Sequence, residues 1–279
     1  MQVSLSELSE VKGIGKKTIK RIREYKLADE GYISEYDDNL HLDRNSVNQG
    51  DCLELMNGIP DKSVNMILAD LPYEATNRNE WDRVINLDKM WQQYKRVIKD
   101  KGAIVLTATQ PFVNKLINSS KEIFRYDWIW EKSTITNVLN AKRQPVRNHE
   151  HILVFYKNQP KYNPQGIEKV NKVTKQGTSS LNYGERKENN TYKQEYTGYP
   201  RSVQKFKSTT TNSHPTQKPV ALFEYLIKTY TNEGDLVLDN TAGSGTTGVA
   251  CQNTGRDYIL IEKEKEYYDK SIERVNRHS

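Results

Sequence analysis

Three carboxylate residues stand where an α/β protein binds its ligand. Each follows a short apolar run that predicts a strand, and they are Asp70, Asp239 and Glu262. In an open α/β sheet, ligands gather at the edge formed by the carboxyl ends of the strands. We therefore expect these three side chains to contribute to one site.

The tetrapeptide Asp70-Leu71-Pro72-Tyr73 combines groups that suit a planar amino group. Proline fixes its backbone φ angle, which holds the neighbouring carboxylate, carbonyls and ring in place. The Asp70 carboxylate and a main-chain carbonyl could accept the two amino hydrogens while Tyr73 stacks on the ring. The alternative is a surface turn with a packed tyrosine, and four residues alone do not decide between the two.

A glycine-rich turn follows Asp239. Gly243-Ser244-Gly245 opens a predicted helix, and the next strand ends at Glu262. Glycines let the backbone approach a ligand closely, and a strand-end acid can accept hydrogen bonds from ribose hydroxyls. The pattern is typical of one half of a nucleotide-binding fold.

These residues depend on an alternation of strands and helices that begins at about Asn45. The alternation predicts an α/β fold with a mostly parallel, twisted sheet covered on both faces. The expected strands are 63–69, 102–107, 128–130, 152–156, 236–238 and 258–261, and the expected helices are 87–99 and 219–230.

Eight stretches, in family order from about Ser46 to the C-terminus, resemble the β-group DNA amino-methyltransferases. These are the permuted branch of the N6-adenine and N4-cytosine enzymes, found in phages and restriction–modification systems. The stretches are NQGDCLEL, MILADLPY followed by WD, KGAIVLTATQPF, WIWEK, PVRNHEHILVFYK, HPTQKPVALFEYLIK, GDLVLDNTAGSGTTGVA and GRDYILIEKEKEYY. The resemblance implies a Rossmann-like class I methyltransferase fold and S-adenosylmethionine as the cofactor.

The resemblance also assigns roles to matching positions. Asp70, Leu71, Pro72 and Tyr73 match the catalytic element, in which Leu71 contributes its carbonyl. The residues implied to contact the cofactor are Asp51, Thr216, Lys218, Asp239, Gly243, Gly245 and Glu262. Among these, Asp51 matches an acid near the adenine, Glu262 matches the acid at the ribose, and the others lie toward the methionine end.

Three features depart from the family pattern. Leu71 replaces a proline, and Thr241-Ala242 replaces commoner loop residues, but neither change removes a group that the chemistry needs. Glu74 stands where relatives commonly carry glycine, so it adds a second carboxylate beside the site.

The net charge of +6 is unevenly distributed along the chain. Residues 11–26 include seven basic residues and one acidic, residues 161–213 include ten basic and four acidic, and each segment therefore carries +6. The remainder of the chain carries −6. Two basic segments on an acidic body favour a polyanionic partner, which we expect to be double-stranded DNA.

Residues 1–44 are expected to form an N-terminal segment and linker before a methyltransferase domain over 45–279. Two glycines between predicted helices resemble a helix-hairpin-helix, which offers main-chain N–H groups to a DNA phosphate. The residues expected to contact DNA there are Gly13, Gly15, Lys16, Lys17 and Lys20. The alternative is a basic helical hairpin that only packs on the main domain.

The segment at about 160–213 lies where the family places its target-recognition region. Tyrosines alternate there with basic and amide residues; Arg and Lys suit guanine or phosphate, and Asn and Gln suit adenine. We expect Lys187, Arg201 and Lys205 to contact DNA, with part of the segment ordered only by DNA. A flexible, solvated insertion is the alternative.

Composition excludes several other classes. The sequence has no apolar run that could span a membrane, no signal-peptide pattern, and only two cysteines, too few for a disulfide scaffold. We expect a cytoplasmic protein of a bacterial host or a phage-infected cell. No further ligand cluster accompanies His149-Glu150-His151, so no metal is expected, and Trp128 and Trp130 are expected in the core.

Asp70 favours methylation of adenine N6, because N4-cytosine enzymes commonly have Ser at that position. The target base must be flipped out of the duplex to reach the site. An N4-cytosine methyltransferase is one alternative, and a DNA-binding protein with an inactive methylase fold, suggested by Glu74, is another. A homodimer is common in the family, and nothing in the sequence selects or excludes it.

Overall fold

The computed structural model describes residues 40–72, 85–175, 191–209 and 217–277. The chain divides into two units, Met1–Leu40 and His41–Ser279, and the structure below is that of the second unit. The expected N-terminal DNA-contact residues lie outside the described residues, as do Tyr73, Glu74, Lys187 and Thr216. The expected division into 1–44 and 45–279 stays a prediction.

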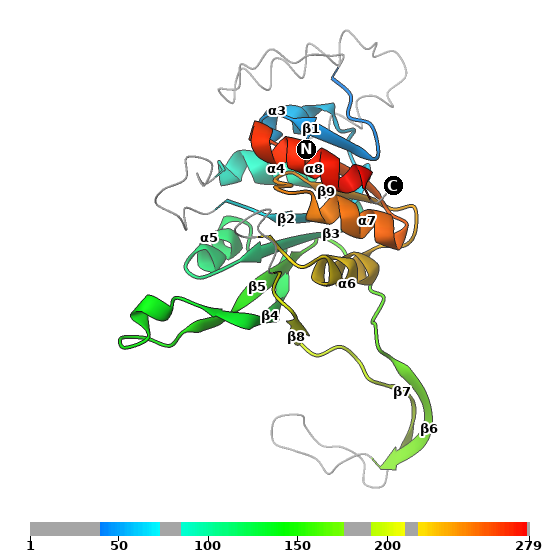
Figure 1. Ribbon diagram of the computed structural model, residues 1–279. Coiled ribbons are helices and arrows are strands. Elements are labelled where there is room, and N and C mark those ends of the chain that lie inside the picture. The colour runs from blue at the N-terminus through cyan, green and yellow to red at the C-terminus, as the bar shows by residue number, and fades with distance from the viewer. Residues whose placement is uncertain (1–39, 73–84, 176–190, 210–216, 278–279) are drawn as a thin grey trace, which may run out of the picture. The chain divides into compact units, whose positions relative to one another are not determined.

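An eight-stranded sheet forms the centre of this unit (Figure 1). Its strands, from one edge to the other, are β1 (Ser46–Gln49), β10 (Asp257–Glu262), β9 (Leu236–Asp239), β2 (Val64–Asp70), β3 (Ile98–Ala108), β5 (Arg147–Phe155), β4 (Phe124–Thr136) and β8 (Val203–Phe206). β5 is antiparallel to both neighbours, and every other pair is parallel. The predicted α/β class with a mostly parallel sheet is confirmed.

Helices cover both faces of the sheet (Figure 1). They are α3 (Cys52–Leu55), α4 (Leu87–Val97), α5 (Phe112–Ser119), α6 (Val220–Tyr230), α7 (Thr246–Thr254) and α8 (Lys265–Asn276), with 3-10 turns η1 (Met56–Gly58) and η2 (Val138–Asn140). Successive residues of a strand point to opposite faces. Accordingly, Val154 of β5 belongs to the core beneath α6, whereas the Phe155 ring lies 5.0 Å from that of Trp91 in α4.

The central strands form because their side chains are apolar on both faces, as a sheet covered by helices requires. In β2, Val64 and residues 66–69 are buried, and in β9 all four residues are. The structure adds β1 and β8, which were not predicted from the sequence. It also makes β4 longer than predicted at both ends and β5 longer at its polar N-terminal end. Trp128 and Trp130 are buried in the core, as expected.

Part of the basic segment 161–213 also forms strands. β6 (Glu168–Lys175) and β7 (Thr191–Thr197) pair as a separate antiparallel hairpin, and β8 joins the main sheet beside β4. Among the residues described, no helix combines the length and apolar character needed to cross a membrane.

Candidate active site

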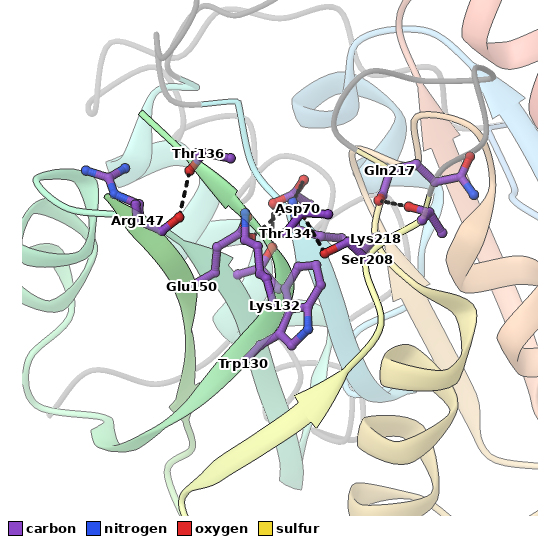
Figure 2. Close-up of polar contacts among 12 residues, drawn as sticks. Asp70, Trp130, Lys132, Thr134, Thr136, Arg147, Glu150, Ser208, Gln217 and Lys218 are labelled. Carbon is purple, nitrogen blue, oxygen red and sulfur yellow. Dashed lines mark hydrogen bonds and ion pairs between the residues drawn. The ribbon is translucent and has the colours of Figure 1, made fainter. Parts of the chain in front are cut away.

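Asp70 is the last residue of β2 and lies at the carboxyl edge of the sheet. One of its carboxylate oxygens accepts a hydrogen bond from the Thr107 hydroxyl of β3, and the other lies 2.5 Å from the Nζ of Lys218 (Figure 2). Its main-chain carbonyl accepts a bond from the Thr241 hydroxyl at 3.1 Å. The neighbouring strand β3, the segment before α6 and the glycine loop therefore fix the position of Asp70.

Lys218 lies between two carboxylates. Its Nζ is 2.5 Å from Asp70 Oδ2 and 3.4 Å from Glu150 Oε2, and its side chain is only 5% exposed. Glu150, in β5, also forms an ion pair with Lys132 of β4. The four charges thus alternate in sign, with Glu150 and Lys218 buried and Asp70 and Lys132 partly exposed at the two ends (Figure 2). We refer to Asp70, Lys218, Glu150 and Lys132 as the charge chain.

Burial and neighbouring charge set the protonation of the two acids. Desolvation raises the pKa of Asp70, and the Glu150 carboxylate adds to this increase, while Lys218 opposes it. Desolvation also acts to raise the pKa of Glu150, but Lys218 and Lys132 outweigh it and hold that pKa below its usual range. Of the two acids, Glu150 is therefore the one that is more strongly held in its ionised form, and Asp70 is the one that binds a proton more readily.

No role was predicted from the sequence for Thr107, Lys132 or Glu150. The detectable signal was Glu150, a charged residue that shares a strand face with the buried residues Ile152 and Val154. Its neighbours His149 and His151 share the opposite face, where the His151 Nδ1 lies 2.8 Å from Asp127 Oδ2. In the described part of the chain, no group of three or more potential ligands could hold a metal ion.

The glycine loop after β9 begins with a buried acid. Asp239 accepts hydrogen bonds from the Thr241 N–H at 3.1 Å and from the Thr247 hydroxyl. Burial, the largest influence, raises the pKa of Asp239 to about 7 despite these bonds. The loop folds back on the sheet, because the Ala242 N–H donates to the Ile261 carbonyl at 2.9 Å.

Two glycines of this loop occupy the left-handed backbone region. Gly243 has φ 52° and Gly245 has φ 76°. A Cβ on Gly245 would lie 3.0 Å from the Ser271 Cβ of α8, so a side chain there would force α8 to move away. Glycine is therefore required at Gly245 both for its backbone angle and for the close approach of α8.

Glu262, at the end of β10, is held by main-chain donors. One carboxylate oxygen accepts the Gly243 N–H at 2.7 Å, and the other accepts the Glu264 N–H at 2.9 Å. Each oxygen keeps a further lone pair, so the carboxylate can still accept hydrogen bonds from two hydroxyls. Burial raises the pKa of Glu262.

Asp51 lies beside this acid, because the Gly50 N–H donates to the Glu262 carbonyl at 3.0 Å. The Asp51 side chain caps α3 by accepting the Leu53 N–H at 3.0 Å. Its second oxygen lies 3.2 Å from the Nζ of Lys263. The second oxygen is therefore at the surface of the site, where a polar ligand could reach it.

A buried amide supports the floor of the loop. Asn240 accepts the Tyr94 hydroxyl at 2.5 Å and donates to the Cys52 sulfur at 3.5 Å. Tyr94 belongs to α4 and Cys52 to α3, so these two hydrogen bonds join the glycine loop to both helices. Asn240 falls within a stretch that resembles the family, but no role was predicted for it from the sequence.

The structure therefore brings together most of the described residues predicted for catalysis and cofactor binding. Seven of them end or follow the adjacent strands β2, β9 and β10: Asp70, Leu71, Pro72, Asp239, Gly243, Gly245 and Glu262. Lys218 contacts Asp70, and Asp51 adjoins Glu262. Two residues predicted to contact DNA lie elsewhere, in or just before β8. They are Arg201 and Lys205, the second of which pairs with Glu131 at 3.2 Å.

Comparisons with known proteins converge on one family. The family model described as DNA methylase, N6_N4_Mtase, matches residues 64–273. The chain is 29% identical over 253 residues to the type II methyltransferase M2.MboI of Moraxella bovis, covering 83% of this chain and 87% of that protein. It is 30% identical over 234 residues to M2.DpnII of Streptococcus pneumoniae, covering 78% of this chain and 84% of that protein.

Solved structures show the same architecture. The crystal structure of an M1.HpyAVI–SAM complex matches with a TM-score of 0.56 and 25% identity, covering 83% of this chain and 98% of that one. The cytosine-N4-specific PvuII DNA methyltransferase matches with a TM-score of 0.62 and 17% identity, covering 85% of this chain and 92% of that one. The second likeness concerns the fold alone.

Proposed function

Because the chain belongs to the N6/N4 family of DNA methylases, we propose that it transfers a methyl group from S-adenosylmethionine to the N6 atom of a flipped adenine in duplex DNA. The observation that carries this proposal is the Asp70 carboxylate at the end of β2. It is fixed by Thr107 and Lys218, and the Leu71 carbonyl and Pro72 follow it directly. It is thereby prepared to receive an amino group.

The glycine loop and the strand-end acids fit the cofactor. Glu262 keeps lone pairs for two ribose hydroxyls, and Asp239 offers a carboxylate on the methionine side, where a cationic amino group would pair with it. The missing side chain at Gly245 keeps the loop tight against α8. When bound, S-adenosylmethionine supplies an electrophilic methyl group on a sulfonium sulfur.

The protein groups act mainly by position and hydrogen bonding. The ionised Asp70 carboxylate and the Leu71 carbonyl accept the two N6 hydrogens, which draws the nitrogen lone pair out of conjugation with the ring. Asp70 then holds the proton that the methylated nitrogen loses. Its raised pKa suits this role, because a more basic carboxylate binds the proton more readily.

Adenine is the proposed target because position 70 carries a carboxylate rather than a serine hydroxyl. An ionised carboxylate only accepts hydrogen bonds, and it can take up a proton. A serine hydroxyl also donates a hydrogen bond, and it is a much weaker base. The similar structures include an enzyme named for N4-cytosine, so the base is the part of the proposal that needs a direct test.

The test is incubation of the full chain with methyl-labelled S-adenosylmethionine and DNA from a methylation-deficient bacterium. Mass analysis of the nucleosides should reveal N6-methyladenine, and Asp70→Ala should abolish it while cofactor binding persists. N4-methylcytosine would overturn the choice of base. Absence of any product with the wild-type chain, or full turnover by Asp70→Ala, would overturn the catalytic proposal.

We further propose that the reaction takes place in the cytoplasm, where host or phage DNA is accessible. The segment around 160–213 and the N-terminal segment supply the DNA contacts in this proposal, through Lys187, Arg201 and Lys205 and through the 13–20 hairpin. A homodimer stays open, and sedimentation of the free protein would decide it.

A further inference from the structure

The hairpin that joins β4 to β5, residues 133–146, extends from the same edge of the sheet as the active site. β5 is antiparallel to β3, and His151 near its start pairs with Ala108 at the end of β3. The start of β5 and the end of β4 therefore lie at the carboxyl edge, where Asp70 ends β2. Figure 1 shows this hairpin projecting from the sheet, and Figure 2 shows the hydrogen bond from the Thr136 hydroxyl to the Arg147 carbonyl at its base.

The tip of the hairpin has a defined turn structure. Asn137 adopts a left-handed conformation with φ 65°, and η2 follows directly. The Asn140 and Ala141 N–H groups donate to the Asn137 and Val138 carbonyls at 3.1 and 3.0 Å, and the Asn140 amide bonds to the Asn137 side chain. The turn thus holds the residues between them in one orientation.

That orientation places apolar side chains in solvent. Within the turn, Val138 is 55% exposed and Leu139 is fully exposed at 102%; Ile135, near the end of β4, is also 55% exposed. A leucine side chain left in water forgoes the free energy that its burial would contribute. A group of exposed apolar residues on and beside a hydrogen-bonded turn indicates a surface that is covered when a partner binds.

The charges around these residues select the partner. Between Lys132 and Glu150 the sequence contains Lys142, Arg143 and Arg147 and no acidic residue. Lys142 and Arg143 are exposed, and the remaining polar residues of the hairpin carry hydroxyls or amides. Cations beside an apolar tip match the phosphates and the stacked bases of DNA better than they match a neutral protein surface.

We propose that the 133–146 hairpin is a DNA-binding element separate from the 161–213 segment, with Leu139 inserting between bases next to the target and Lys142 and Arg143 contacting phosphates. The proposal rests on the proposed function. A flipped base leaves a gap and an unstacked neighbour, and an apolar side chain that enters the helix compensates part of the unstacking cost. The hairpin is suited to this because it projects from the edge that holds Asp70.

The test compares Leu139→Ala with the wild type on two duplexes that share one methylation site. In the first duplex the target base is paired, and in the second it faces an abasic position, so it is already unpaired and costs less to flip. We expect kcat/KM for Leu139→Ala to fall about tenfold on the paired duplex and by less than about twofold on the second. Equal losses on both duplexes, or no loss, would overturn the insertion of Leu139.

The charged residues are tested by the double variant Lys142→Ala/Arg143→Ala. The magnitude of the salt slope of DNA binding, measured by fluorescence anisotropy, should fall by about 2, because each phosphate that a cation neutralises adds about 0.9 to it. The matched control is Lys101→Ala/Lys121→Ala, which removes two exposed cations at the opposite edge of the sheet and should leave the slope unchanged. An unchanged slope for the first variant, or equal changes for both, would overturn the phosphate contacts.

Two further outcomes are distinguishable. Binding by anisotropy requires no turnover, so a wild type that binds DNA without methylating it contradicts the proposed function and leaves the salt-slope test of the hairpin intact. If Leu139→Ala instead changes the sedimentation of the free protein while both duplexes react normally, the tip contacts a second copy of the chain. That result overturns the proposal.

Discussion

At the residue scale, the charge chain explains how two acids and two lysines can lie beside each other with little exposure to solvent. Each carboxylate has a lysine partner, and Lys218 links the Asp70 pair to the Glu150 pair. Removing one member of such a buried group is costly, because its partner is left as an uncompensated charge. The charge chain also has an electrostatic role, since the Glu150 charge raises the pKa of Asp70.

Glu150→Gln tests both roles. The variant should lose about 3–5 kcal/mol of unfolding free energy in urea, because Lys132 and Lys218 lose their shared counter-ion. Glutamine removes the negative charge near Asp70, so the pKa of Asp70 should fall and the acidic limb of kcat/KM should move to lower pH. The direction follows because Asp70 accepts the N6 proton only when it is ionised.

The matched control is Glu122→Gln, which removes an exposed acid paired with Lys95. Surface pairs contribute little, so its unfolding free energy should change by less than about 1 kcal/mol and its pH profile should not move. If Glu150→Gln loses stability without any shift of the acidic limb, Glu150 supports the fold and does not position Asp70.

At the element scale, the sequence predicted the parts of the fold that are apolar on both faces. The expected strands 236–238 and 258–261 correspond closely to β9 and β10, because uninterrupted apolar runs bounded by polar residues have few other solutions. The far end of β4 was not predictable, because residues 131–136 are polar except for Ile135 and pair with β5 only through tertiary contacts. β8 depends likewise on pairing with a strand distant in the chain.

The site was predictable to a similar degree. Residues at strand ends, such as Asp239 and Glu262, could be located from the apolar runs before them and from the family motifs. Glu150 and Lys132 could not be assigned, because their role comes from side chains that meet across β4, β5 and the start of α6. Contacts of that kind follow from tertiary packing and leave only a faint local signal.

The packing of the glycine loop against α8 gives a prediction at this scale. Gly245→Ala should destabilise the protein by more than about 2 kcal/mol, because alanine adds a strained left-handed backbone and a Cβ within 3.0 Å of the Ser271 Cβ. Cofactor affinity, measured by calorimetry, should fall as well, since the loop and α8 can accommodate the methyl group only by separating.

Gly234→Ala isolates the backbone contribution. Gly234 has the same φ of 76°, yet a Cβ there meets nothing within 4 Å. Its cost should be about 1 kcal/mol, with cofactor affinity unchanged. Equal effects of the two substitutions would mean that the contact with Ser271 contributes nothing beyond the backbone angle.

At the scale of the whole molecule, the charge is divided among three parts of the chain. The segments 11–26 and 161–213 each carry +6, and the remaining residues together carry −6. An acidic body does not attract DNA by itself, so binding should depend on the basic segments and on local cations such as those of the 133–146 hairpin. The first segment falls within the unit Met1–Leu40, apart from the unit that contains the active site.

This division predicts the effect of removing residues 1–26. The shortened chain retains the whole unit His41–Ser279, so its methylated sequence should be unchanged. Its DNA affinity should fall and the slope of log K against log salt should become shallower, by about 0.9 for each phosphate that the protein no longer neutralises. Both quantities come from anisotropy titrations at several salt concentrations, with the methylated site mapped by sequencing.

A full-length Lys16→Ala/Lys17→Ala/Lys20→Ala variant separates charge from length, because it should reproduce most of the change in slope. A shift in the methylated sequence after truncation would contradict the division, since it would mean that residues before Leu27 read bases rather than phosphates.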